Sequence, residues 1–120
     1  MDCLFCKIAG GETNSYTLYE DDIVRCFMDL NPDSNGHCLI VPKKHILDLN
    51  DMDADTWNHI LNVTKKMKHH LEERLNPDGL TLIQNNGDIQ IVKHFHLHLK
   101  PYYKENQTIL PVEEIYEKLK

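Results

Sequence analysis

Three histidines alternate with apolar side chains late in the chain, in the run His94-Phe95-His96-Leu97-His98. Successive side chains of a β-strand point to opposite faces, so a strand over Ile91–Leu99 would place all three imidazoles on one face. Alternate Cβ atoms then lie roughly 6.5–7 Å apart, close enough for the rings to share one phosphate-sized ligand or one hydrogen-bond chain. A polar face without function would carry mixed polar residues. The run therefore predicts a reaction site or a metal site, with Phe95, Leu97 and Leu99 in the core.

A row of imidazoles suits chemistry at phosphorus. A neutral imidazole, with a pKa of about 6.5, is a nucleophile at physiological pH and does not repel a phosphate. Its attack gives a phosphoimidazole, while a neighbouring imidazolium neutralises the phosphoryl oxygens and donates a proton to the leaving group. The alternative is a catalytic zinc held by His94, His96 and His98, or by two of these with His37.

Composition narrows the class of protein. The 120 residues are 41% hydrophobic, which predicts a single domain over 1–120 with a core of its own. A formal charge of −6 argues against a nucleic-acid partner. The chain shows neither a signal-peptide pattern nor an apolar run of membrane-spanning length, so we expect a cytoplasmic protein without a membrane partner. In that compartment the four cysteines are expected to be thiols or metal ligands.

The histidine run needs a scaffold, and periodicity indicates one. Turn residues separate β-rich segments, and apolar residues recur at helical spacing from Asp53 to Asn76 and again after Pro111. These patterns predict an α+β fold with a mostly antiparallel sheet, one long central helix and a short C-terminal helix. The expected strands are 16–19 and 23–28 as a hairpin, 38–41, and 80–84 and 91–99 as a second hairpin; the long helix would begin at Asp51 or Asp53.

The sequence resembles the histidine triad (HIT) family of nucleotide hydrolases and transferases, whose signature is His-φ-His-φ-His-φ-φ with φ apolar. Further elements occur in family order over about residues 3–101, followed by a tail over 102–120. These elements are Cys3-Leu4-Phe5-Cys6-Lys7-Ile8, Phe27-Met28-Asp29-Leu30-Asn31-Pro32, Gly36-His37-Cys38-Leu39-Ile40-Val41-Pro42-Lys43-Lys44-His45, Asn85-Asn86-Gly87 and Gln90-Ile91-Val92-Lys93-His94.

The resemblance implies a homodimer that binds a purine nucleotide across the histidine face and releases a nucleoside monophosphate. Substrates would be nucleoside phosphoramidates or (di)nucleoside polyphosphates. By position, His96 would be the transiently nucleotidylated nucleophile, His98 and His37 would contact the phosphate and assist the leaving group, and His94 would buttress His96. The implied substrate-binding residues are Asp29 at the ribose hydroxyls, Phe27 and Leu30 near the base, and Asn85 and Gln90 on the phosphate and leaving-group side.

Two departures from the family pattern affect the expected site. Only Asp88 and Ile89 separate Gly87 from Gln90, where the family loop is two residues longer, and this favours the alternative of a nucleotide-binding regulatory module with little turnover. Lys100 replaces the last apolar position of the signature. It is either a solvated lysine at a strand end or a substrate contact.

The opening Cys3-x-x-Cys6 has the spacing of two thiolates on one tetrahedral zinc. In zinc-containing branches that this chain resembles, the remaining ligands correspond to His45 and His94. Such a zinc would be structural, because all four positions are filled by protein. The alternative is a pair of ordinary thiols.

Overall fold

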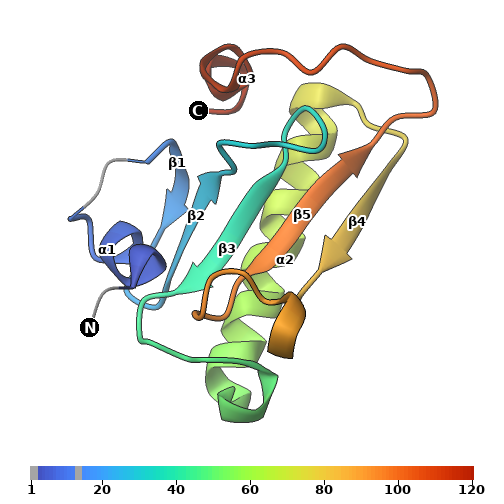
Figure 1. Cartoon of the computed structure of the whole chain (residues 1–120). Coiled ribbons are helices and arrows are strands. Elements are labelled where there is room, and N and C mark those ends of the chain that lie inside the picture. The colour runs from blue at the N-terminus through green and yellow to red at the C-terminus, as the bar shows by residue number, and fades with distance from the viewer. Residues whose placement is uncertain (1–2, 13–14) are drawn as a thin grey trace.

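The computed structural model describes residues 3–12 and 15–120 of the chain. Within these ranges, the chain runs from a short N-terminal helix through five strands and one long helix to a short C-terminal helix (Figure 1). The elements are α1 (Leu4–Ala9), β1 (Thr17–Glu20), β2 (Val24–Met28), β3 (Cys38–Pro42), a 3₁₀ turn (Leu49–Asp51), α2 (Ala54–Leu75), β4 (Gly79–Ile83), a second 3₁₀ turn (Gly87–Ile89), β5 (Leu97–Tyr102) and α3 (Val112–Leu119).

The strands form one five-stranded antiparallel sheet in the order β1-β2-β3-β5-β4. Figure 1 shows α2 running behind this sheet, with α1 beside the β1 and β2 end and α3 beyond the top. The predicted α+β fold, with its antiparallel sheet, long helix and C-terminal helix, is confirmed. None of the helices in the described ranges is long and apolar enough to cross a membrane.

The long helix begins and ends where the sequence signals predict. Of the two candidate N-caps, Asp53 is the one used: its carboxylate accepts a hydrogen bond from the backbone N–H of Thr56 at 2.9 Å. The helix ends at Leu75, and its C-cap, Asn76, adopts the left-handed conformation (φ 50°) that commonly terminates helices. Its buried residues pack on the sheet and hold the rear face of β3 and β5 in place.

Strand β3 is buried on both faces, which explains its uninterrupted apolar sequence. Cys38 and Ile40 pack toward α2 and α3 in the main core, whereas Leu39 and Val41 pack with Phe27 against α1 on the opposite face. The sheet therefore has a second, smaller apolar layer under α1. The ring of His96 packs against this layer through Phe5.

The predicted strand over 91–99 is wrong for its first six residues, because β5 begins at Leu97 and continues to Tyr102. The chain bends over 91–94, and the backbone N–H of Phe95 donates to the carbonyl of Ile46 rather than to a strand. The Pro42 carbonyl accepts a hydrogen bond from the ring of His94, not from the amide of a continuing strand. The predicted core positions hold nevertheless, since Phe95, Leu97 and Leu99 all lie in the main core.

Candidate active site and metal centre

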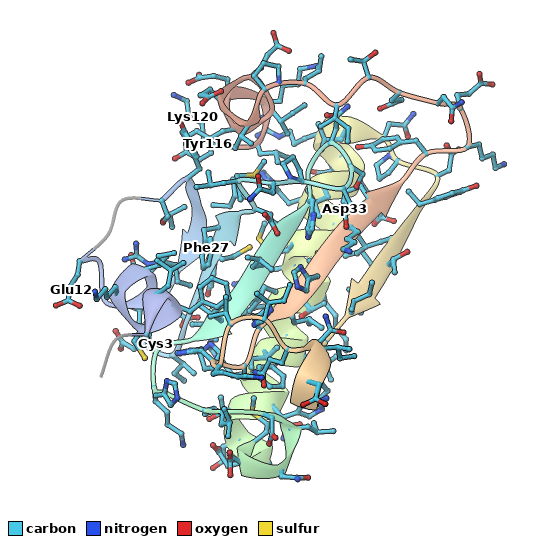
Figure 2. The ribbon with its side chains drawn as sticks, in the orientation of Figure 1. Cys3, Glu12, Phe27, Asp33, Tyr116 and Lys120 are labelled. Carbon is cyan, nitrogen blue, oxygen red and sulfur yellow. The ribbon has the colours of Figure 1, made fainter. Side chains whose placement is uncertain are left out.

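A cavity of about 500 Å³ lies on the face of the sheet opposite α2. Apolar side chains of α1 and β2 form one wall, including Phe5 and Phe27, and His37, His96 and His98 form the polar part. Figure 2 shows Phe27 on β2 and Asp33 in the loop that follows this strand. An apolar recess with a few convergent polar groups is the usual form of a small-molecule site.

His96 has one ring nitrogen committed to the backbone. Its Nδ1 lies 2.7 Å from the carbonyl oxygen of His94, and a carbonyl oxygen only accepts, so Nδ1 carries the proton and Nε2 keeps its lone pair. The ring is 5% exposed, and burial lowers the pKa of His96 below its usual value. His96 is therefore a neutral imidazole at physiological pH, with Nε2 as its nucleophilic atom.

His37 and His98 form a hydrogen-bonded pair. The backbone N–H of Asp33 donates to Nδ1 of His37 at 3.0 Å, so the proton of His37 lies on Nε2, which faces Nδ1 of His98 at 2.9 Å. Burial is the largest cause that lowers the pKa of His98 to about 4, and the neighbouring His96 and His37 lower it further. Without a ligand the pair is neutral and can take up a proton when an anion binds.

Asp29 lies beside this pair, with Oδ2 3.4 Å from Nε2 of His37 and 4.0 Å from Nδ1 of His98. These three side chains are close enough to be considered as metal ligands. The Asp33 amide argues against it, because Nε2 of His37 keeps its proton as long as Nδ1 accepts that hydrogen bond. His96 belongs to neither of the metal-ligand groups found in the described residues, which also disfavours the catalytic-zinc alternative.

A second cluster combines Cys3, Cys6, His45 and His94, whose ligand atoms all lie within 4.8 Å of one another. Nδ1 of His94 is 3.3 Å from each sulfur, and Nδ1 of His45 is 3.1 Å from Sγ of Cys6. With Zn–S near 2.3 Å and Zn–N near 2.0 Å, ligand atoms on a tetrahedron lie roughly 3.3–3.8 Å apart. The cluster therefore already has nearly the dimensions of a zinc site.

The hydrogen bonds around His94 prepare it as a ligand. Its Nε2 donates to the carbonyl of Pro42 at 2.8 Å, which leaves the lone pair on Nδ1, the atom that faces the two sulfurs. Burial, together with the neighbouring Cys3, raises the pKa of Cys6 to about 11, so the Cys6 thiol resists ionisation in the absence of a metal. A bound dication would reverse that effect, because its charge stabilises thiolates.

Helix α1, which the sequence analysis did not predict, serves both sites. Cys3 caps it, since its Sγ accepts the backbone N–H of Cys6 at 3.2 Å, and one helical turn brings the two thiols to the same side. Between them, Phe5 meets the ring of His96 edge-on, with centroids 4.9 Å apart. Two features of the sequence could have indicated this helix, namely the cysteine at its N-cap and the apolar residue inside the CxxC. The helix has only six residues, which are too few to show a helical period.

The structure brings most of the predicted site residues to the cavity. Phe27, Asp29, Leu30 and Asn85 line it together with the histidines already described. Gln90 does not line it. Its side chain is 2% exposed and donates to the carbonyl of Leu47 at 2.6 Å, so in this arrangement Gln90 anchors the short loop instead of facing the cavity.

Comparison with known proteins agrees with this geometry. A family model described as the HIT domain matches residues 10–105, and the chain belongs to the HIT family. It is 36% identical to an uncharacterized HIT-like protein of Methanocaldococcus jannaschii, over 94% of this chain and 88% of that protein. It is 40% identical to an adenosine 5′-monophosphoramidase of Candida albicans, over 82% of this chain and 69% of that protein.

A solved structure extends the likeness to the fold. The crystal structure of a zinc-bound histidine triad family protein from Mycobacterium smegmatis superposes with a TM-score of 0.90 at 31% identity, covering 99% of this chain and 91% of that one. The HIT fold of this chain is thus established. Some relatives are named as hydrolases, whereas most carry no assigned activity.

The lowered pKa of His98 predicts a loss of stability on acidification. Its pKa is about 4 in the folded protein and near 6.5 when unfolded, so the unfolded chain binds more protons between these values. We expect the free energy of unfolding to decrease as pH falls from 6.5 to 4.5, and to decrease less steeply in His98→Asn. Urea unfolding at several pH values measures this, with His69→Asn on the exposed face of α2 as the control. Equal slopes in wild type and His98→Asn would contradict the prediction.

Proposed function

We propose that this protein is a nucleotide hydrolase or transferase that acts on the α-phosphate of nucleoside phosphoramidates or (di)nucleoside polyphosphates through a covalent nucleotidyl-His96 intermediate. The observation that carries the proposal is the hydrogen bond from Nδ1 of His96 to the His94 carbonyl. It leaves Nε2 as the free nucleophilic atom of a residue that lines the cavity. Relatives named as adenosine 5′-monophosphoramidases support the choice of substrate class.

In the first step, Nε2 of His96 forms a bond to the α-phosphorus while the bond from phosphorus to the leaving nitrogen or oxygen breaks. The leaving group takes a proton from the His37–His98 pair, which acquires that proton as the anionic phosphate binds and offsets their lowered pKa. The Asp29 carboxylate, within 4.0 Å of both rings, balances the added charge. In the second step, water attacks phosphorus, the bond to His96 breaks, and the proton of water returns to the pair.

The remaining lining residues would hold the nucleotide. Asp29 is assigned to the ribose hydroxyls, and the apolar wall with Phe27 and Leu30 to a purine base. Asn85 is assigned to the phosphate side, and Gln90 would need to leave the Leu47 carbonyl to join it. The net charge of −6 supports a small nucleotide over a nucleic acid. The single-domain organisation and the cytoplasmic location stay predictions.

The mass of the protein during turnover tests whether His96 is the nucleophile. We expect adenosine 5′-phosphoramidate, quenched within one turnover, to leave a covalent adenylate that intact-mass spectrometry detects. His96→Ala should show no adduct and a loss of turnover of about 10⁴-fold or more, because the nucleophile of a covalent mechanism has no substitute.

His69→Ala, on the exposed side of α2, is the matched control and should keep both adduct and turnover. If the wild type binds AMP but forms no adduct with adenosine 5′-phosphoramidate and releases no AMP from it, the proposed enzymatic activity is refuted. That result would favour the nucleotide-binding module. That alternative draws support from the short Gly87–Gln90 connection and from the position of the Gln90 side chain.

We also propose that Cys3, Cys6, His45 and His94 hold a structural zinc ion. The cluster supplies two sulfurs and two imidazole nitrogens, and the zinc-bound Mycobacterium smegmatis relative supports the identity of the metal. Bound there, the ion would complete a closed tetrahedral site without an open position for water. The residues would tie α1 to the segment that carries His96.

Metal analysis tests this proposal. We expect one zinc per chain in the wild type, and loss of zinc in Cys6→Ser together with a lower melting temperature, because metal binding to a folded site adds to stability. Cys26→Ala, which removes a buried thiol of the main core, should keep its zinc. If the folded wild type binds no zinc at micromolar concentration, the zinc proposal is refuted, and Cys3 and Cys6 are ordinary thiols.

A homodimer is proposed from the free edge of β4. This strand is the last of the sheet, its outer edge meets no strand within 3–12 and 15–120, and Leu82 on it is 51% exposed. Light scattering should give the mass of two chains for the wild type and of one for Leu82→Glu. Leu49→Glu, which replaces a leucine of similar exposure (52%) in the 3₁₀ turn before α2, is the matched control and should stay dimeric. A monomeric wild type would refute the dimer.

A further inference from the structure

Lys100 lies on β5 two residues after His98, on the same face of the sheet. Its Nζ is 2.6 Å from Oδ2 of Asp33, and the lysine side chain is only 23% exposed. The charge of Lys100 reaches the catalytic pair, since it contributes to lowering the pKa of both His37 and His98. Lys100 is therefore not a solvated lysine at a strand end.

Lys100 and Asp33 stand between two cavities. Both residues line the 500 Å³ histidine cavity and also an adjoining cavity of about 330 Å³. In the described part of the chain, Lys100 is the only lysine or arginine that lines either cavity. A ligand that places one phosphate at the histidines would therefore find no other lysine or arginine for a second phosphate among the described residues that line these cavities.

Hydrogen bonds fix several residues that line the second cavity. Asn35 donates to the carbonyl of Thr108 at 3.0 Å and accepts from the N–H of Leu110 at 2.8 Å, which fixes the tail over the cavity. The hydroxyl of Tyr103 donates to the carbonyl of Asn35 at 2.7 Å. In contrast, the buried Oγ of Ser34, another lining residue, has no hydrogen-bond partner. A hydroxyl without a partner, in a cavity that a lysine also lines, can donate to a phosphate oxygen.

The present partner of Lys100 can be exchanged. Asp33 is 65% exposed, and an ion pair with one exposed member contributes little to stability. A phosphate group offers more charge than a carboxylate and several acceptor oxygens. Asp33 lies in the loop after β2 (Figure 2), and its exposed carboxylate can turn to water when another anion replaces it.

We propose that Lys100 binds a second phosphate group of the nucleotide, in addition to the phosphate that faces His96. The first phosphate rests on the proposed function. The second comes from one of two sources with the same chemistry: a phosphate on the sugar, or the β-phosphate of a leaving chain. In either case Lys100 decides whether the protein prefers nucleotides with more than one phosphate.

The affinities of three nucleotides that the protein cannot cleave test this proposal. AMP carries one phosphate, adenosine 3′,5′-bisphosphate adds one on the sugar, and α,β-methylene-ADP adds one on the chain. We expect one of the two latter ligands to bind the wild type at least about tenfold more tightly than AMP by calorimetry. The ligand that does so identifies the source of the second phosphate.

Lys100→Met should abolish this preference and change the dissociation constant for AMP by less than about twofold. Methionine suits the site because the family pattern has an apolar residue there. Lys104→Met, which removes an exposed lysine outside both cavities, is the matched control. Binding of AMP with no preference for a second phosphate, or a preference that survives Lys100→Met, would overturn the role of Lys100 and leave the proposed function intact. No binding of any of the three would overturn both.

Discussion

One residue, His94, joins the parts of this site through three different atoms. Its carbonyl accepts a hydrogen bond from Nδ1 of His96, its Nε2 donates to the carbonyl of Pro42 at the end of β3, and its Nδ1 faces the sulfurs of Cys3 and Cys6. The backbone must bend at this point for a ring, not an amide, to reach the Pro42 carbonyl. Because of that bend β5 begins only at Leu97, and the bond to the His94 carbonyl leaves Nε2 as the ring nitrogen of His96 that is free to attack.

Burial of several imidazoles in one place explains why the site is neutral before it acts. Desolvation is the largest cause of the lowered pKa of His37, His94, His96 and His98. Neutral rings supply a nucleophile and hydrogen bonds without mutual charge repulsion. A phosphate introduces the negative charge that makes protonation of the His37–His98 pair favourable, so the acid would form only when a substrate is present. Lys100, the only lysine or arginine among the described residues that line the two cavities, would bind a second anion.

The sequence predicted the elements whose signals are local. Asp53 and Asn76 delimit α2, and the uninterrupted apolar run of β3 predicted a buried strand. It failed where tertiary hydrogen bonds overrule the pattern. The histidine alternation indicated a strand over 91–99, yet residues 91–96 are not in the strand, and the His94 and His96 rings hydrogen-bond to backbone carbonyls there. Helix α1 was too short for periodicity, and the position of Gln90 depends on a carbonyl, Leu47, that lies 43 positions away.

The protonation state of the His96 ring tests the central claim most directly. Long-range ¹H–¹⁵N correlation spectra of ¹⁵N-histidine-labelled protein, assigned with His96→Gln, report which ring nitrogen carries the proton. The account predicts a neutral ring protonated on Nδ1, with Nε2 bare, at pH 7. A His96 ring protonated on Nε2, or on both nitrogens, would contradict it, because no lone pair would then face the cavity.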